Sequence, residues 1–176
     1  RLDTLTSAGS VDISPRIWEQ YAVKTALEVE RIRLAHRVAA VGIGAFFAAL
    51  EPGKTEAEVA SAVESAVQNR MGHDGVWFAR GWAFIQSGPN SVDGATFSRT
   101  TGRALRAGEL VMIEMAVCVN GYWADITRTG AVRGGQVDAR HRAFFDAVFE
   151  GQARAVRAIG PGVPAREVDE VARNFI

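Results

Sequence analysis

Two acidic residues, Glu114 and Asp125, lie in an otherwise apolar stretch on either side of Asn120-Gly121. An Asn-Gly pair flanked by hydrophobic runs is the strongest short-range signal for a two-residue hairpin turn. Counting back from such a turn pairs Glu114 with Thr127, and Ala116 with Asp125. Because side chains alternate between the faces of a strand, both acids and Thr127 then share one face, with the β-carbons of the acids roughly 5.5–8 Å apart.

Two carboxylates on one face of an apolar hairpin repel each other, and burying either ion costs several kcal/mol or forces protonation. A divalent metal removes this repulsion, and two metals about 3.5–4 Å apart can activate a water between them. The small side chain of Ala116, between the acids, leaves room for ions. The alternative is a solvated face on which Arg128 or Arg99 is the charge partner, and the register alone favours neither.

Two segments with helical periodicity precede this hairpin. Each opens with a capping box, Thr25-Ala-Leu-Glu28 and Thr55-Glu-Ala-Glu58, in which the two side chains bond to each other's backbone amides. The boxes predict helices over about 25–50 and 55–70, with Pro52-Gly53 ending the first. The apolar stripe of the second helix consists of Val59, Ala62, Val63, Ala66 and Val67.

Strand-like runs occupy the middle of the chain. Residues 82–85 predict one strand, and residues 110–119 and 122–132 predict the two strands of the hairpin. Asp138 is placed to cap a further helix over about 139–159. The order of these elements predicts a mixed helix-and-sheet domain.

The two ends of the chain resemble each other. A long helix followed by Leu50-Glu-Pro-Gly53 precedes a second helix, and the same order recurs around Ile159-Gly-Pro-Gly162, with a helix beginning near Ala165. The two prolines are 109 residues apart. A duplicated helix–helix–sheet unit is the simplest account, and it predicts further strands after Ile176. The alternative is that Pro-Gly merely ends two unrelated helices.

The segment Gly121-Tyr-Trp-Ala-Asp-Ile-Thr-Arg-Thr129, with an acidic residue eleven positions before its Asp, resembles the core of the pita-bread metallopeptidases of family M24. That family includes aminopeptidase P, prolidase, methionine aminopeptidase and the metal-free creatinase. Four upstream segments follow the Xaa-Pro peptidase pattern in the same order, namely 24–33, 52–56, 87–90 and 103–110. The resemblance covers about residues 20–176.

This resemblance implies an α/β (α+β) pita-bread fold with an internal duplication, in which helices pack on the outer side of an antiparallel sheet. Residues 1–22, which show no clear period, are expected to be a lead-in from an N-terminal domain. Residues 23–176 are expected to form the N-terminal half of the catalytic domain and the start of its second half. The C-terminal part of the domain is expected beyond Ile176, where the chain stops inside a helical pattern.

By position, Glu114 and Asp125 match the two metal ligands of the family's hairpin, and Thr127 is expected to orient a ligand carboxylate from the second layer. One His and two Glu beyond Ile176 would complete a site for two divalent ions, Mn, Co or Zn. Glu114 stands where the family has Asp, and Thr96 is the nearest counterpart of its substrate-handling His. The implied function is metal-dependent hydrolysis of the Xaa-Pro bond in short peptides, of the dipeptidase or aminopeptidase type.

The departures at Glu114 and Thr96 keep two alternatives open. One is a non-catalytic member that binds peptides or partners, and the other is a metal-free, creatinase-like hydrolase. The metal-free branch lacks the Asp that is here Asp125. The resemblance also implies a homodimer.

Composition narrows the classes of partner. Twenty basic and twenty acidic residues give zero net charge, so no global field selects nucleic acid or an anionic membrane. The longest apolar stretch, 38–50, is too short to span a bilayer. The single Cys118 is expected in the core, as are at least two of Trp77, Phe78 and Trp82, and this cysteine usage fits the cytoplasm.

Overall fold

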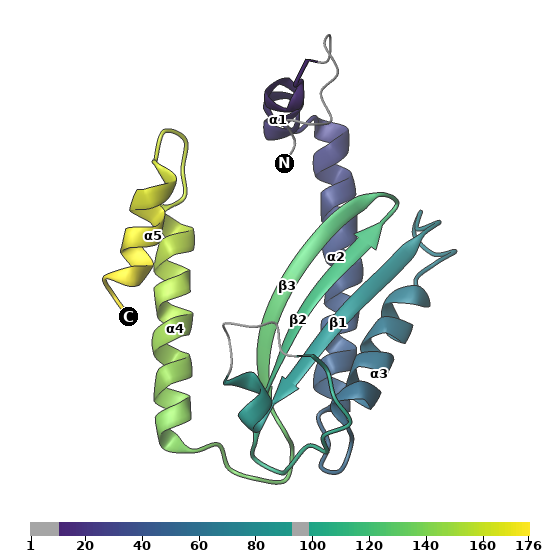
Figure 1. The fold of residues 1–176 in the computed structure, drawn as a ribbon, viewed down its shortest axis with the longest axis vertical. Coiled ribbons are helices and arrows are strands. Elements are labelled where there is room, and N and C mark those ends of the chain that lie inside the picture. The colour runs from purple at the N-terminus through teal and green to yellow at the C-terminus, as the bar shows by residue number, and fades with distance from the viewer. Residues whose placement is uncertain (1–10, 93–98) are drawn as a thin grey trace.

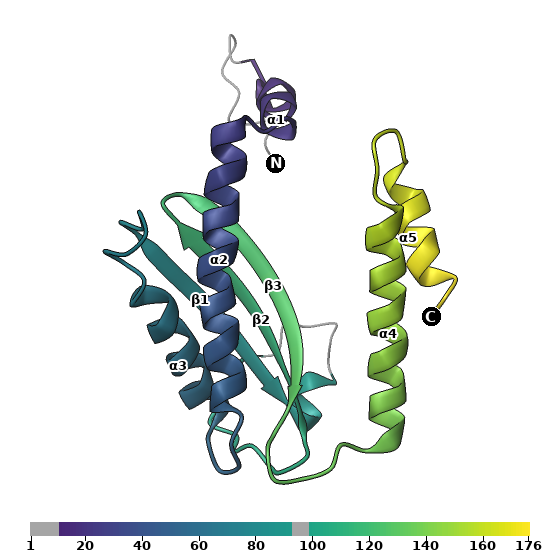
Figure 2. The ribbon, with the colours of Figure 1, turned by 180° about the vertical axis from the view of Figure 1, so that it is seen from behind.

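A computed structural model describes residues 11–92 and 99–176 of the chain (Figure 1). The elements are α1 (Ser14–Ala22), α2 (Ala26–Ala49), α3 (Glu56–Gln68), β1 (Ala79–Ser87), the 3-10 helix η1 (Gly88–Ser91), β2 (Leu110–Val119), β3 (Tyr122–Ala131), α4 (Ala139–Ala158) and α5 (Ala165–Arg173). The three strands form one antiparallel sheet in the order β1-β2-β3. Helices α2 and α3 lie across one face of this sheet, as Figure 2 shows from behind.

Both predicted capping boxes form and fix where the long helices begin. The Thr25 hydroxyl accepts from the Glu28 amide at 3.3 Å, while the Glu28 carboxylate accepts from the Thr25 amide at 2.7 Å. The corresponding distances for Thr55 and Glu58 are 3.2 and 2.7 Å. Each box therefore satisfies two amides that the helix itself leaves without acceptors.

The core lies between the sheet and the two helices. Strand β2 buries every second side chain, as expected of a sheet that is covered on one face. Helix α2 approaches the sheet closely at Gly42, where a β-carbon would lie 3.0 Å from Val67 and 3.1 Å from Met115. The largest fully buried side chains include Phe46, Leu50, Val59, Val63, Val67, Ile85, Ile113, Met115 and Val117.

Helix α2 has the length and apolar composition that would suffice to cross a bilayer. In the structure its apolar side meets the sheet and α3, and six of its residues are buried there. Of its apolar window, 33% is buried inside the molecule.

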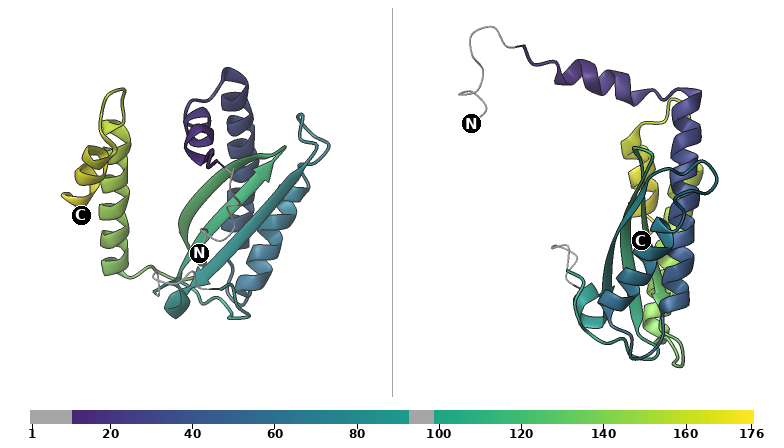
Figure 3. Two further views of the ribbon diagram at one scale, coloured as in Figure 1. Left: turned by 45° about the horizontal axis from the view of Figure 1, so that its top comes forward. Right: turned by 90° about the vertical axis from the view of Figure 1, so that its right-hand side faces the viewer.

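The N-terminal segment contains a helix, α1, that its sequence pattern does not predict. Helix α1 begins with the Ser14 amide bonded to the Asp12 carboxylate at 2.9 Å and has Pro15 in its first turn. Its apolar residues recur every four positions, but the helix is too short for this period to be recognised within the first 24 residues. None of its residues is buried, and α1 projects from the body of the molecule (Figure 3).

Two other expectations need correction. Strand β1 runs over nine residues, longer than the predicted 82–85. The exposed fractions of Trp77, Phe78 and Trp82 are 74%, 36% and 44%, so the prediction that at least two of them belong to the core is wrong. Alternation along β1 turns Trp82 toward the face that α2 and α3 leave uncovered. Cys118 is buried, as expected.

Helices α4 and α5 form an antiparallel pair beside β3 (Figure 1). Asp138 caps α4 as predicted, accepting from the amides of Arg140 and His141. Gly162 in the α4–α5 connection has φ 84°, close to the φ of 87° for Gly53 in the α2–α3 connection. The two helix–helix connections thus share a left-handed glycine, while the strands expected after α5 stay a prediction.

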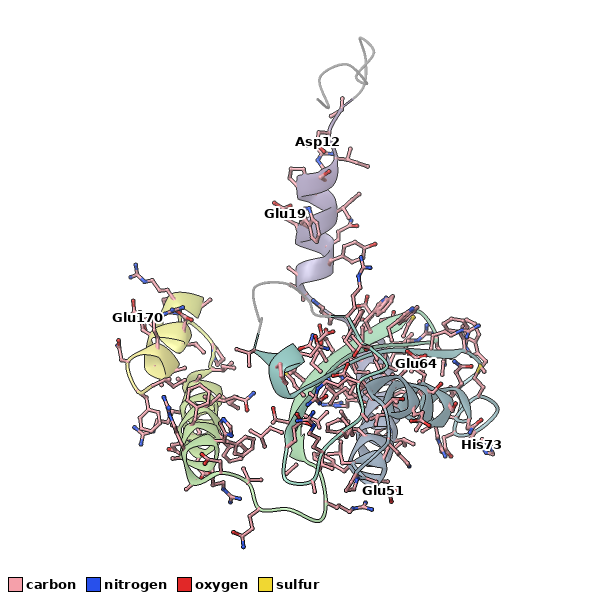
Figure 4. All side chains as sticks on the ribbon, turned by 60° about the horizontal axis from the view of Figure 1, so that its bottom comes forward. Asp12, Glu19, Glu51, Glu64, His73 and Glu170 are labelled. Carbon is pink, nitrogen blue, oxygen red and sulfur yellow. The ribbon has the colours of Figure 1, made fainter. Side chains whose placement is uncertain are left out.

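The outer edge of β1 is closed by side chains rather than by another strand. The Ala83 amide donates to the Glu64 carboxylate at 3.0 Å, and the Ile85 amide donates to the Thr100 hydroxyl at 2.9 Å. Glu64 reaches this edge from α3 (Figure 4). The Ser87 amide donates to the Glu56 carboxylate at 2.8 Å, so three successive outward amides are satisfied.

Glu56 is fully buried, yet its carboxylate is saturated with hydrogen bonds. It accepts from the amide and hydroxyl of Ser87 at 2.8 and 2.7 Å, and from those of Thr101 at 2.9 and 2.7 Å. The Asn90 side-chain amide adds a bond at 3.0 Å. One carboxylate therefore joins the start of α3 to the end of β1, to η1 and to the segment that leads into β2.

We expect Glu56→Ala to lower the free energy of unfolding by at least about 2 kcal/mol, because the buried amide and hydroxyl of Ser87 would lose their acceptor at roughly 1–3 kcal/mol each. Glu58→Ala, which removes an exposed capping interaction on the same helix, should cost clearly less. Denaturant unfolding of the full-length protein measures both changes. Equal losses in the two variants would contradict this account of Glu56.

Candidate metal centre

The hairpin has the register that its turn predicts. Asn120 and Gly121 have φ values of 51° and 86°, the left-handed pair that a type I′ turn requires. Glu114 pairs with Thr127, and Ala116 pairs with Asp125, as counting from the turn predicts. Glu114, Asp125 and Thr127 therefore share one face.

That face is the one that α2 and α3 leave uncovered. The residues of β2 that flank Glu114, Ile113 and Met115, point the other way into the core and are fully buried. Glu114 is half-buried, whereas Asp125 and Thr127 on β3 are exposed. The two acids thus lie on strands whose opposite face packs on the core, and they remain open to solvent and ligands.

Glu114 is disturbed electrostatically by its surroundings. Burial raises the pKa of the Glu114 carboxyl above its ordinary value, and the negative charge of Asp125 raises it further. Within residues 11–92 and 99–176, no hydrogen bond or salt bridge joins either acid to another side chain. Arg128, the proposed charge partner, instead donates to the Thr127 carbonyl at 2.8 Å.

This arrangement fits a divalent cation. Two carboxylates without partners supply oxygen ligands for a hard or borderline metal, and the cation would relieve the repulsion that raises the pKa of Glu114. The small Ala116 lies between them on the same face. The donor set is only part of a centre, because no group of three potential ligands occurs among the described residues.

The other residues considered from the sequence lie elsewhere. Thr96 falls outside the described residues. His36 is exposed on α2, where its ring nitrogen lies 2.9 Å from the Ile32 carbonyl oxygen. His73 and His141 are exposed too, so the described histidines are surface residues.

A pair of stacked tryptophans beside the acids was not anticipated. Trp82 on β1 and Trp123 on β3 have ring centroids 5.3 Å apart and an interplanar angle of 19°. Alternation along β3 puts Trp123 on the face of Asp125, so half of this pair could have been placed from the sequence. Trp82 could not, because the long connection between β1 and β2 does not fix their register.

Comparison with known proteins gives one family. Residues 30–176 match the sequence profile of metallopeptidase family M24. The Xaa-Pro dipeptidase of Pyrococcus furiosus is 33% identical over 154 residues, which make up 88% of this chain and 42% of that protein.

Solved structures agree with the sequence match. The prolidase from Pyrococcus furiosus is similar with a TM-score of 0.79 and 32% identity, over 93% of this chain and 46% of that one. The X-Pro aminopeptidase from Thermotoga maritima gives a TM-score of 0.78 and 25% identity, over 93% and 44%. The expected pita-bread architecture is therefore confirmed, and the chain spans less than half the length of these relatives.

The raised pKa of Glu114 gives a pH-dependent test in chelator-treated, full-length protein. The folded state holds this proton more tightly than the unfolded state does, so the contribution of Glu114 to stability is complete below about pH 4 and is lost as the pH rises through the raised pKa. Glu114→Gln removes that loss. We expect it to gain roughly 0.2–1 kcal/mol over the parent at pH 7, the range of a cross-strand like-charge contact, and nothing at pH 4.

Glu19→Gln is the matched control, because Glu19 lies on the projecting helix α1 (Figure 4). Its unfolding free energy should follow that of the parent protein across the same pH range. The repulsion would be contradicted if the stability gain of Glu114→Gln over the parent were no larger at pH 7 than at pH 4.

Proposed function

Because the chain belongs to metallopeptidase family M24, we propose that the full-length protein hydrolyses the Xaa-Pro bond of short peptides with the help of bound divalent ions. The observation that carries the proposal is the pair of carboxylates, Glu114 and Asp125, on the open face of the sheet, which have no side-chain partner within residues 11–92 and 99–176. The Xaa-Pro peptidases among the similar proteins support the choice of bond. The chain spans less than half the length of these relatives, so the proposal concerns the full-length protein.

Glu114 and Asp125 would hold the ions, each through carboxylate oxygens. When bound, two divalent ions lower the pKa of water and polarise a carbonyl group, so that amide hydrolysis proceeds near neutral pH. Thr127 lies directly opposite Glu114 on β3, where its hydroxyl would fix the orientation of a ligand carboxylate. The exposed position of Asp125 leaves a path for the peptide. Strand β2 keeps Glu114 in place, because its other face packs in the core.

The finer features are part of the same proposal. We propose Mn, Co or Zn as the ions, with one His and two Glu outside this chain as the remaining ligands. A homodimer in the cytoplasm is the proposed state of the protein, and the buried, unpaired Cys118 is compatible with a reducing compartment.

Glu114 also favours a second candidate, a non-catalytic member that binds peptides through the same face. A Glu side chain extends its carboxylate one methylene further than Asp, and metal geometry tolerates little displacement. This candidate predicts a protein that binds Xaa-Pro peptides without hydrolysing them.

Metal content of the full-length protein tests the proposal first. We expect close to two Mn, Co or Zn ions per chain after mild dialysis, and a marked loss of bound metal in Asp125→Ala. Its kcat/KM on an Xaa-Pro peptide should fall more than about a hundredfold, since even outer ligand-orienting groups are worth 10–100-fold. Glu19→Gln should keep both metal and activity. A parent protein that stays metal-free in added Mn would sink the peptidase mechanism and favour the non-catalytic candidate.

Thr127→Val tests the orienting role separately. This change keeps the side-chain volume and removes the hydroxyl, so metal affinity should weaken by about 10–100-fold while the stability of the chelated protein changes little. Isothermal calorimetry with Mn gives the affinity. An unchanged dissociation constant would remove Thr127 from the site.

A further inference from the structure

We propose that the stacked rings of Trp82 and Trp123 are a specificity site that takes the Xaa side chain of the substrate and prefers a large apolar or aromatic residue there. The inference rests on the proposed function and adds to it a preference for the kind of Xaa side chain.

The stack is a surface feature. The exposed fractions of Trp82 and Trp123 are 44% and 56%, although their rings lie nearly parallel with centroids 5.3 Å apart. Trp82 comes from β1 and Trp123 from β3, so the pair bridges the middle strand at Ala116 and Cys118. Large aromatic side chains bind apolar partners through offset or edge contacts, and here ring surface remains free to do so.

The stack lies beside the candidate metal ligands. Trp123 is two residues before Asp125 on one face of β3, a separation of roughly 7 Å along the strand. Trp82 lies opposite Ala116, which lies opposite Asp125, so these three residues form one row across the sheet. Two strand spacings amount to about 10 Å. A peptide residue extends by about 3.5 Å, so a short peptide with its scissile bond at the acids can place the adjacent side chain on the rings.

The choice of Xaa follows from the substrate class. One side of the scissile bond is always proline, so the side chain that can vary next to the bond belongs to Xaa. Ring surfaces select among side chains by apolar contact, which discriminates strongly between small and large residues.

Steady-state kinetics on Ala-Pro, Leu-Pro and Phe-Pro tests the inference in the metal-loaded, full-length protein. We expect kcat/KM for Phe-Pro and Leu-Pro to exceed that for Ala-Pro about tenfold or more, the scale on which apolar pockets discriminate. Trp82→Ala and Trp123→Ala should bring the ratio close to one, and the Phe variants should retain part of it. Trp77→Ala is the matched control, because Trp77 is 74% exposed and contacts Phe78 instead of the stack, and its ratio should stay at the parent value.

Ratios that are equal in the parent protein and both Ala variants would overturn the inference while leaving the proposed function intact. If the parent hydrolyses neither these dipeptides nor the tripeptides that extend them beyond proline, the proposed function fails, and calorimetric binding of Phe-Pro and Ala-Pro then tests the stack by itself. Tighter binding of Phe-Pro that both Ala variants lose would support the stack, and equal binding of the two peptides would exclude it.

Discussion

The register of the β2–β3 hairpin is the constraint on which the candidate site depends, and two left-handed residues set it. Asn120 and Gly121 adopt the positive φ values of a two-residue turn, and a slip of one strand by one residue would put Glu114 and Asp125 on opposite faces of the sheet. The Asn120 side chain does more than tolerate this conformation. Its carbonyl oxygen accepts from the amides of Trp77 and Phe78, both at 3.1 Å, and its amide group donates to the Gly75 carbonyl at 2.9 Å. One turn residue thus fixes the pairing of β2 with β3 and also holds the chain that enters β1.

Local chemistry made part of this molecule predictable and left the rest to tertiary contacts. The capping boxes, the hairpin register and the shared face of the acids follow from interactions between residues close in sequence, so counting was enough. Helix α1 has no buried face to give it a long apolar period, and its first turn was overlooked. The role of Glu56 depends on donors 31 to 45 residues away, and no local pattern announces a buried carboxylate with such partners. Size and apolarity predict at least two of Trp77, Phe78 and Trp82 in the core, but they say nothing about which face of a strand is covered.

Glu56 and Glu114 illustrate opposite solutions to one problem. Glu56 is fully buried as an acceptor, and backbone amides and hydroxyls from three segments offset the loss of water. Glu114 is only half-buried, has a carboxylate neighbour, and within the described residues has no donor. The first arrangement is complete and serves the fold. The second is left incomplete at some cost to the fold, which is the usual mark of a group reserved for a ligand.

The two edges of the sheet differ in the same way. Along β1, Glu64, Thr100 and Glu56 accept from three outward amides, whereas no amide of β3 in the described residues donates to a side chain. Edge strands with free amides act as templates for further pairing. The edge of β3, which carries Asp125, is therefore the more open of the two. A strand added there would lie next to the candidate ligands, so extending the sheet would also add side chains beside the site.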